Sequence, residues 1–335
     1  MKVLVAGDFA FEFYEPDFCF GLREAGCEVI ELPALRFFGP GSLLRRAQTR
    51  LVAGPGVAAA NAALVAACAR HKPDVVLLWR TPWATPLSLW LCRAAGAGKV
   101  ALYNNDDPFG PDRDLRIWRR WRALLPHADA TFVYREVNVA EARAAGARHV
   151  SVLRSAFHPL RHRPPGVPPD CDVVFAGHCE DDGRLDALDA LVRDGSLRVR
   201  LFGTGWERAL RGRPAQALLP VVPVFGEAYV RAIASAKAAL VFLSGRNRDQ
   251  YTRRCFEIPA IGTPMLAPPT GELRALFGDD ALWYGSPAEL LTQARLVCRD
   301  EAVRGRYAAA GRRRVVEGGH DVISRAREFI RAMAP

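Results

Sequence analysis

The sequence contains very little lysine. Of 46 basic residues only Lys2, Lys72, Lys99 and Lys237 are lysine, so arginine carries nearly all of the formal net charge of +10. The arginines are scattered among Leu, Trp and Val, and no basic tract of the kind that binds nucleic acid stands out. We therefore expect no nucleic-acid partner.

The arginines are scattered through amphipathic stretches such as residues 36–50, 113–122 and 304–314, where acidic residues are scarce. Such faces are either solvated helix surfaces or contacts for an anionic lipid or acceptor. The second interpretation predicts peripheral contact with the inner face of a membrane.

Several catalytic motifs are also missing. There is no Walker loop, no Gly-x-Gly-x-x-Gly after the first expected strand and no Gly-x-Ser-x-Gly elbow. These absences argue against kinases, nicotinamide dehydrogenases and α/β-hydrolases, respectively. We expect no bound cofactor.

No metal-binding pattern is present either. The eight cysteines form no Cys-x-x-Cys pair, and prolines surround His158 and His162, so a helix that would align these two histidines is not expected. Free thiols indicate a reducing compartment, and the apolar run at residues 3–6 is too short for a signal peptide or a membrane span. The sequence therefore predicts a cytoplasmic protein without a metal site.

Short apolar runs alternate with helical stretches along the first half of the chain. Strands are expected at residues 3–6, 28–32, 75–78, 100–103, 130–133 and 150–153. This alternation is typical of a parallel sheet with right-handed crossovers.

A proline-rich segment, residues 158–170, interrupts the alternation, and the pattern then restarts. The second set of strands is expected at residues 172–176, 198–202, 239–243, 264–267 and 281–284. We therefore predict an α/β protein with two Rossmann-like, doubly wound domains, residues 1–157 and 171–320. Residues 158–170 would link them, and a helix in residues 321–335 could pack back on the first domain.

The most informative stretch is TRRCFEIPAIGTP, residues 252–264, which places two arginines and a carboxylate on the first turns of an expected helix. Free N–H groups at a helix start and the helix dipole favour phosphate, and arginine adds charge-assisted hydrogen bonds. Arg253, Arg254 and Glu257 can share one face, where the carboxylate would suit a ribose diol. The alternative is an ordinary ion pair on a surface helix.

Polar residues follow the strands, where sites in parallel sheets belong. Asp8 and Phe9 follow the first strand, and Asp106 and Asp107 follow the fourth. Either of the paired aspartates could act as an acceptor base or bind hydroxyls, or both could form an Asx-turn that caps the next helix.

Further candidates follow strands of the second half. Gly177 and His178 come after its first strand, where an imidazole could touch a phosphate or a sugar, although a lone histidine is usually structural. Gly203 and Trp206 follow the next strand, where the indole could stack on a base or sugar or could sit in a tight turn.

The pattern Thr252-x-Arg254-x-Phe256-Glu257-x-x-Ala260-x-Gly262-x-Pro264, followed by residues 273–277 and Tyr284, resembles the C-terminal half of the CgeB-like spore-maturation glycosyltransferases. These are relatives of glycosyltransferase group 1. The resemblance covers roughly residues 172–329, and the first domain only loosely through Asp106-Asp107-Pro108.

This resemblance implies a GT-B fold, in which two Rossmann-like domains face a central cleft. The second domain would hold a nucleotide-sugar donor and the first a glycan, lipid-linked or protein acceptor, with no obligatory metal. Arg254 would bind the diphosphate and Glu257 the ribose, with Arg253 and Thr252 beside them.

The resemblance also implies that Gly177 and Arg184 lie near the phosphates or the transferred sugar. Asp249 stands where many relatives have an earlier acidic residue, so it joins the donor side as well.

The expected function is therefore sugar transfer, with Arg254 stabilising the charge that grows on the leaving diphosphate. If the sugar configuration inverts, Asp106, Asp107 or Asp8 would be the base, whereas with retention the leaving phosphate can take the proton. A sugar-nucleotide epimerase of the same shape and a non-catalytic nucleotide-sugar-binding scaffold are the alternatives.

Overall fold

The computed structural model describes residues 1–39 and 43–334. Residues 40–42, within the arginine-rich stretch 36–50, and Pro335, within the C-terminal segment, lie outside the described residues. The chain forms two compact units, Met1–Arg154 with Val322–Pro335 (unit 1) and Ser155–Asp321 (unit 2).

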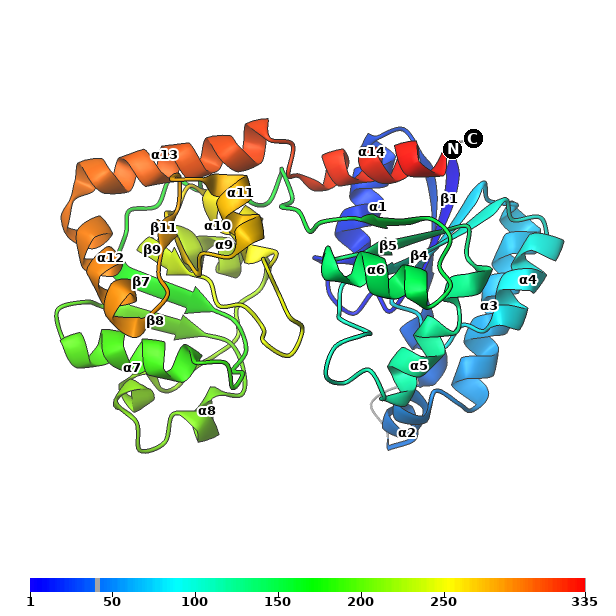
Figure 1. Ribbon diagram of the computed structural model, residues 1–335, viewed down its shortest axis with the longest axis horizontal. Helices are drawn as coiled ribbons and strands as arrows, with labels where there is room; N and C mark the ends of the chain where they lie inside the picture. Colours follow the sequence, from blue (N-terminus) through cyan, green and yellow to red (C-terminus); the bar gives the residue numbers. More distant parts are fainter. Residues whose placement is uncertain (40–42, 335) are drawn as a thin grey trace. The chain divides into compact units, whose positions relative to one another are not determined.

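Unit 1 is a six-stranded parallel sheet covered by helices on both faces (Figure 1). Its strands are β1 (Lys2–Gly7), β2 (Glu28–Pro33), β3 (Val75–Trp79), β4 (Lys99–Asn104), β5 (Ala130–Val133) and β6 (Val150–Val152). Its helices are α1 (Glu15–Glu24), α2 (Leu43–Leu51), α3 (Pro55–His71), α4 (Pro86–Ala94), α5 (Arg116–Arg122), α6 (Val137–Ala144) and α14 (Val322–Met333), with short 3₁₀ turns η1 (Ala34–Phe38) and η2 (Leu125–His127).

The inner strands β1, β3, β4 and β5 are mostly apolar because both of their faces are buried, whereas the edge strand β2 carries the exposed Glu28 and Glu31. Leu4 and Ala6 face one core with α3, α4 and α5, whereas Val3 and Val5 face a second core with α1 and α14. The strand order is β2-β1-β3-β4-β5-β6. The chain therefore changes direction between β1 and β3, and the loops that follow these two strands border a crevice.

Unit 2 is built on the same plan with five parallel strands. Its strands are β7 (Cys171–Ala176), β8 (Val199–Phe202), β9 (Ala236–Leu240), β10 (Met265–Ala267) and β11 (Leu282–Trp283). Its helices are α7 (Arg184–Asp194), α8 (Trp206–Ala209), α9 (Gly226–Ala234), α10 (Arg254–Ile261), α11 (Gly271–Phe277), α12 (Pro287–Arg299) and α13 (Glu301–Glu317), with the 3₁₀ turn η3 (Pro214–Leu218).

The strand order of unit 2 is β11-β10-β9-β7-β8, so its change of direction falls between β7 and β9. Strand β9 begins at Ala236, three residues before the start expected from the sequence, because the Ala-rich run 236–240 pairs with both β7 and β10. The expected α/β class with parallel, doubly wound sheets is confirmed.

The C-terminal helix α14 belongs to unit 1. Its Phe329 packs edge-on against Phe18 of α1, with ring centroids 5.7 Å apart. The Lys99 ammonium donates to the carbonyls of Met333 and Ala334 at 3.0 and 2.9 Å, which neutralises the negative end of the helix dipole.

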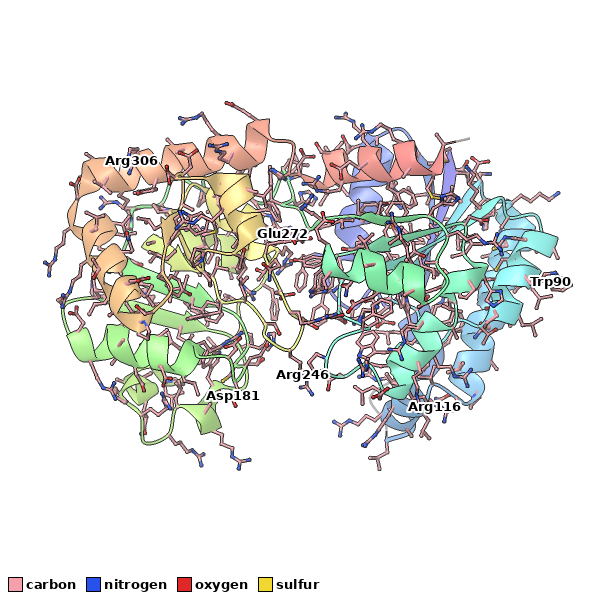
Figure 2. The ribbon with its side chains drawn as sticks, viewed as in Figure 1. Trp90, Arg116, Asp181, Arg246, Glu272 and Arg306 are labelled. Carbon is pink, nitrogen blue, oxygen red and sulfur yellow. The ribbon has the colours of Figure 1, made fainter. Side chains whose placement is uncertain are left out.

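Some large side chains remain outside both cores. Trp90 projects from α4 in Figure 2 and is 63% exposed.

Among the described residues, no single helix is long and apolar enough to cross a membrane. Residues 45–51 and 55–71, which are bent by 71° relative to each other, are long and apolar enough only when taken together.

Candidate functional site

At the carboxyl edge of the unit 2 sheet, the backbone segments that follow β7 and β8 approach each other closely. Gly203, which follows β8, has φ +141°, and a Cβ added there would lie 1.8 Å from the Gly177 carbonyl oxygen. A Cβ on Gly177 would lie 2.9 Å from Nη2 of Arg254. Both positions need glycine, so the structure brings together Gly177, Gly203 and Arg254, three residues selected from the sequence.

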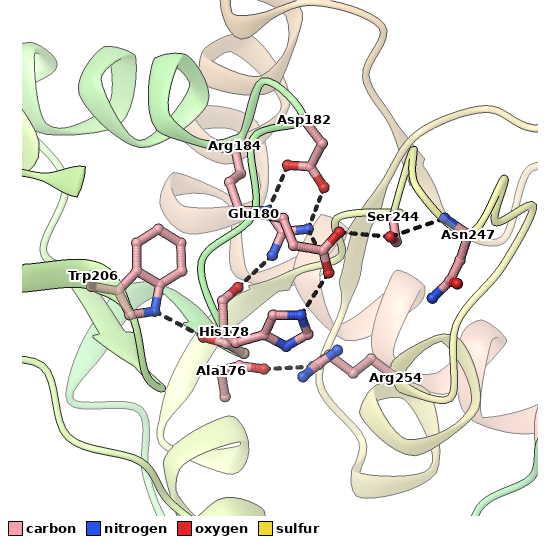
Figure 3. A network of polar contacts seen from close by, with 10 residues as sticks. Ala176, His178, Glu180, Asp182, Arg184, Trp206, Ser244, Asn247 and Arg254 are labelled. Atoms are coloured by element: carbon pink, nitrogen blue, oxygen red, sulfur yellow. Dashed lines mark hydrogen bonds and ion pairs between the residues drawn. The ribbon is translucent and has the colours of Figure 1, made fainter. Parts of the chain in front are cut away.

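Arg254 lies across the end of β7. Its Nε donates to the Ala176 carbonyl (Figure 3), and its guanidinium carbon lies 5.6 Å from the centroid of the Phe175 ring. Among the described residues, no carboxylate lies within ion-pair distance of Arg254. A partly exposed guanidinium held in this way can accept an anion without first breaking an ion pair.

The start of α10 does not itself offer amides to an anion, contrary to the expectation from the sequence. The Thr252 hydroxyl caps the Arg254 N–H at 3.1 Å, and the Thr252 N–H donates to the Cys255 sulfur. The amides of residues 255–257 donate to the carbonyls of Thr252 and Arg253. Among the described residues at this helix start, the partly exposed side chain of Arg254, together with the helix dipole, can attract phosphate.

Glu257 is buried in a polar cluster and is only 1% exposed. Its Oε2 accepts from the Tyr229 hydroxyl at 2.9 Å, and its Oε1 lies 2.9 Å from Nε of Arg253 and 3.7 Å from Nε2 of His162. Burial alone would raise the pKa of Glu257, but Arg253, His162 and Tyr229 together lower it. The carboxylate is therefore charged and engaged within unit 2, and it has no exposed oxygen for a ribose. This placement does not support the predicted ribose contact.

The two histidines of the proline-rich segment take part in this cluster without forming a helix. The backbone N–H of His158 donates to Nδ1 of His162 at 2.9 Å, so that Nδ1 carries no proton. Burial lowers the pKa of His162 to about 4. His162 is consequently a neutral imidazole whose Nε2–H faces Glu257.

An exposed histidine lies near Arg254 (Figure 3). His178 is 63% exposed at its side chain, and its Nε2 lies 2.6 Å from Oε1 of Glu180. The Ser244 hydroxyl, from the loop after β9, donates to Oε2 of Glu180 at 2.6 Å (Figure 3). Hydrogen bonding to His178 lowers the pKa of Glu180 to about 2 despite its partial burial.

Sequence reasoning selected His178 but missed Glu180 and Ser244. Ser244 lies in the loop that follows β9 and leads to α10, so its place near a strand end was a usable signal. Nothing in the local sequence distinguishes Glu180 from its acidic neighbours Asp181 and Asp182.

The structure does not support the expectation that Arg184 binds the donor, because this side chain is bonded within unit 2. Its side chain is 4% exposed, pairs with the Asp182 carboxylate through Nε and Nη2, and donates from Nη1 to the His178 carbonyl. The guanidinium therefore fixes the loop 177–184 and is not open to a ligand.

Trp206 is likewise structural. It is 0% exposed, and its indole Nε1 donates to the Gly177 carbonyl at 2.8 Å. Its ring is buried at the start of α8 and has no exposed face for stacking on a base or sugar. Asp249 is partly buried in the loop after β9, where its N–H donates to the Ser244 carbonyl at 3.0 Å, and its donor role stays a prediction.

Unit 1 has a second polar cluster in the loops that follow β1, β3 and β4, at the point where its strand order changes direction. Nη1 of Arg80, directly after β3, lies 2.9 Å from Oδ2 of Asp106, and Nη2 lies 3.6 Å from Oδ2 of Asp8. Phe9 and Arg80 both have positive φ, 53° and 48°, an uncommon conformation for such side chains. Strained backbone thus holds the loops that carry these charges.

Glu15, at the start of α1, supports the loop after β1. It is 4% exposed and its Oε1 accepts from the Asp8 N–H at 2.9 Å. Burial raises the pKa of Asp8, against the opposing effect of Arg80, which brings this carboxyl closer to the range of a general base at neutral pH. Arg80 and Glu15 were not selected from the sequence, although Arg80 follows a strand and so met the same criterion as Asp8.

Asp107 is corrected from a base candidate to a structural residue. It is 3% exposed, and its Oδ1 accepts from the Phe109 N–H at 3.0 Å and from Nδ2 of Asn138 at 2.9 Å. This is the Asx-turn that the sequence offered as the alternative. Asp106 keeps its partly exposed carboxylate and remains a candidate.

Comparison with known proteins points to one class. A family model described as "Glycosyl transferase-like" matches residues 184–331, which include α10 and its neighbours. The GDP-mannose-dependent alpha-mannosyltransferase of Mycobacterium tuberculosis (strain CDC 1551 / Oshkosh) is 29% identical over 224 residues, 61% of this chain and 57% of that protein. The match thus spans little more than half of this relative's length.

Solved structures share the fold. Sucrose-phosphate synthase (tll1590) from Thermosynechococcus elongatus is 14% identical with a TM-score of 0.68, covering 99% of this chain and 98% of that one. Anabaena HepE in complex with UDP and glucose is 14% identical with a TM-score of 0.66, covering 99% of each chain. At this identity the likeness shows the fold alone, which is α/β with two parallel sheets as in GT-B structures. The matched stretch 184–331 is glycosyl transferase-like.

Proposed function

We propose that this protein is a GT-B glycosyltransferase that uses a nucleotide-diphosphate sugar as donor. The observation that carries the proposal is Arg254, a cation without a carboxylate partner among the described residues, held beside Gly177 at the switch point of unit 2. Ligands of doubly wound sheets bind beyond the carboxyl ends of the strands at such points.

The proposed mechanism depends on charge at the leaving group. As the bond from sugar to diphosphate breaks, negative charge grows on the phosphate oxygens, and a preorganised guanidinium stabilises that state more than the ground state. His178, exposed and next in sequence to Gly177, supplies a second polar contact on the same side. Glu257 acts in this proposal by holding Arg253 at the helix start.

On the acceptor side we propose unit 1, with Asp8 and Asp106 around Arg80. If the reaction inverts the sugar, Asp8 is the preferred base because burial raises its pKa. The acceptor is proposed to be a glycan, a lipid-linked sugar or a protein.

The proposal extends to the family, the donor, the location and the metal requirement. The CgeB-like relationship is supported by the pattern from Thr252 to Pro264, and GDP-mannose or a UDP-sugar as donor by the names of the mannosyltransferase and of the HepE complex. All eight cysteines are free, which supports a cytoplasmic location. Catalysis without a metal is also part of the proposal.

The test is a thermal-shift and calorimetry series on the full chain with UDP, GDP, dTDP, CMP and their common sugars. A ligand at 100 times its Kd stabilises the folded state by about 2.7 kcal/mol. Arg254→Ala should abolish the shift, whereas Arg231→Ala, an exposed arginine on α9, should retain it.

The outcomes separate the alternatives. No stabilisation by any nucleotide would overturn the proposal. Donor binding with conversion to an epimer in the absence of acceptor would indicate a sugar-nucleotide epimerase. Donor binding with no turnover on any class of acceptor would indicate a nucleotide-sugar-binding scaffold.

A further inference from the structure

Helix α2 exposes both arginine and leucine. Arg45, Arg46 and Arg50 are all exposed, and the helix contains no acidic residue. Leu43 and Leu51, at its two ends, are 83% and 52% exposed. A surface helix normally turns its leucines inward, so exposed leucines beside cations point to an apolar or amphipathic partner.

The buried side of α2 is fixed to unit 1, which keeps the opposite side outward. Gln48 is 4% exposed, and its Oε1 accepts the Gly56 N–H of α3 at 2.6 Å. The exposed leucines and arginines therefore lie on the side of α2 that unit 1 does not cover.

Helix α5 extends this surface. It contacts α2, and the two lie side by side at the lower end of unit 1 in Figure 1. Leu115, which precedes α5, is 50% exposed, and Arg116 and Arg119 are exposed, with Arg116 projecting outward in Figure 2. Asp114 is the exposed acid beside them. The α2–α5 surface thus has five exposed arginines and three exposed leucines.

We propose that the α2–α5 surface docks on an anionic lipid bilayer. Each arginine near such a membrane is attracted by the negative surface potential, and the leucines can enter the boundary between headgroups and acyl chains. This combination fits lipid better than a purely polyanionic partner, because phosphates alone would leave the leucines in water. The inference does not depend on the proposed sugar transfer.

Flotation of the full chain with vesicles tests the docking. Vesicles of phosphatidylcholine alone and with about 30% phosphatidylglycerol are compared at 0.1 M salt. We expect binding only to the anionic vesicles, and weaker binding as salt is raised because screening weakens the attraction. Flotation separates bound protein from aggregates, which pellet.

Two variants address the two components of the surface. Arg46→Glu with Arg50→Glu should weaken partition into anionic vesicles by about a hundredfold or more, since it changes four units of charge. Leu43→Ser with Leu51→Ser keeps the charge and should weaken partition by about tenfold. The second pair changes two leucines that are 83% and 52% exposed and reverses no charge, so it keeps the test valid if the charge reversal impairs folding.

The matched control is Arg312→Glu with Arg313→Glu on α13. These arginines are exposed on another basic helix, with Glu317 on the same helix and Asp280 paired with the neighbouring Arg314. The control has the same change in net charge and should keep vesicle binding within about twofold.

Three results would overturn the proposal: equal binding to both kinds of vesicle, equal loss in the control, or unchanged binding in both α2 variants. A dimer in light scattering that Leu43→Ser with Leu51→Ser dissociates, without vesicle binding by the parent protein, would assign the surface to a second copy of the chain.

Discussion

Replacing His162 by Asn should make the protein less sensitive to acid. In the folded protein, Nδ1 of His162 accepts the His158 N–H at 2.9 Å, and the ring lies 3.7 Å from the buried carboxylate of Glu257. A proton on Nδ1 would break the first contact and place a charge in a buried ring. An Asn oxygen can accept the same N–H but does not titrate.

The size of the effect follows from the shift in pKa. Burial lowers the pKa of His162 from 6.5 to about 4, so the unfolded chain binds the extra proton first as pH falls. The stability that depends on neutral His162 is complete above pH 6.5 and is lost as pH falls towards 4. By linkage, the free energy of unfolding should fall by about 2 kcal/mol between pH 7.5 and pH 5 because of this one group.

Urea unfolding of the full chain at half-unit steps from pH 7.5 to pH 5, followed by circular dichroism, measures this dependence. His162→Asn should remove about 2 kcal/mol of the pH-dependent change, while His158, whose pKa burial also lowers to about 4, keeps its own share.

Tyr229→Phe is the matched control. It removes the hydroxyl bonded to Glu257, at a cost of about 1–3 kcal/mol at every pH, and leaves the titrating ring in place. Parallel pH profiles for the parent and His162→Asn would refute the assignment of a neutral buried imidazole, as would a flattened profile in the tyrosine control.

Four other substitutions test the candidate site. Gly203→Ala should unfold unit 2 or cost more than about 3 kcal/mol in a denaturant titration, because its Cβ would lie 1.8 Å from the Gly177 carbonyl oxygen; a cost below about 1 kcal/mol would contradict the close approach. Asp8→Asn should lower kcat for sugar transfer with little loss of stability, whereas Asp107→Asn should lower stability, and the reverse pattern would exchange their roles. Glu180→Gln should flatten the loss of stability between pH 4.5 and about pH 2, because the folded pKa of Glu180 lies at about 2; an unchanged acid melting curve would contradict this.

The fold could be predicted from the sequence because its signals are local. The alternation of apolar runs and helical stretches gave two parallel sheets, and the strand ends pointed to Asp8, Asp106, Gly177 and His178. The start of β9 was placed three residues late, since Ala236 and Ala238 have little strand propensity of their own and enter the sheet through pairing with β7.

The site could be predicted only where one short segment carries it. The spacing of Arg253 and Glu257 predicted their contact, which the structure has at 2.9 Å. The other two partners of that carboxylate are Tyr229 and His162. They come from distant segments of the chain, so no local sequence pattern predicts them. The sequence pattern did not show burial either, and burial makes Arg184 and Trp206 structural residues.

The adjacent residues Arg253 and Arg254 have different partners because neighbouring positions on a helix point about 100° apart. Arg253 turns toward Glu257 and compensates its buried charge, helped by a neutral His162 from the proline-rich segment. That pairing compensates the charge of the carboxylate, and among the described residues no carboxylate lies within ion-pair distance of Arg254. The Arg254 guanidinium contacts the Ala176 carbonyl and the Phe175 ring. Without Arg253, Glu257 would attract Arg254, which already lowers the pKa of this carboxyl, and Arg254 would be less available to an anion. On this reasoning Arg253→Ala should weaken nucleotide binding although the Arg253 side chain is paired with Glu257, and Arg253→Lys, which retains the charge, should restore most of it.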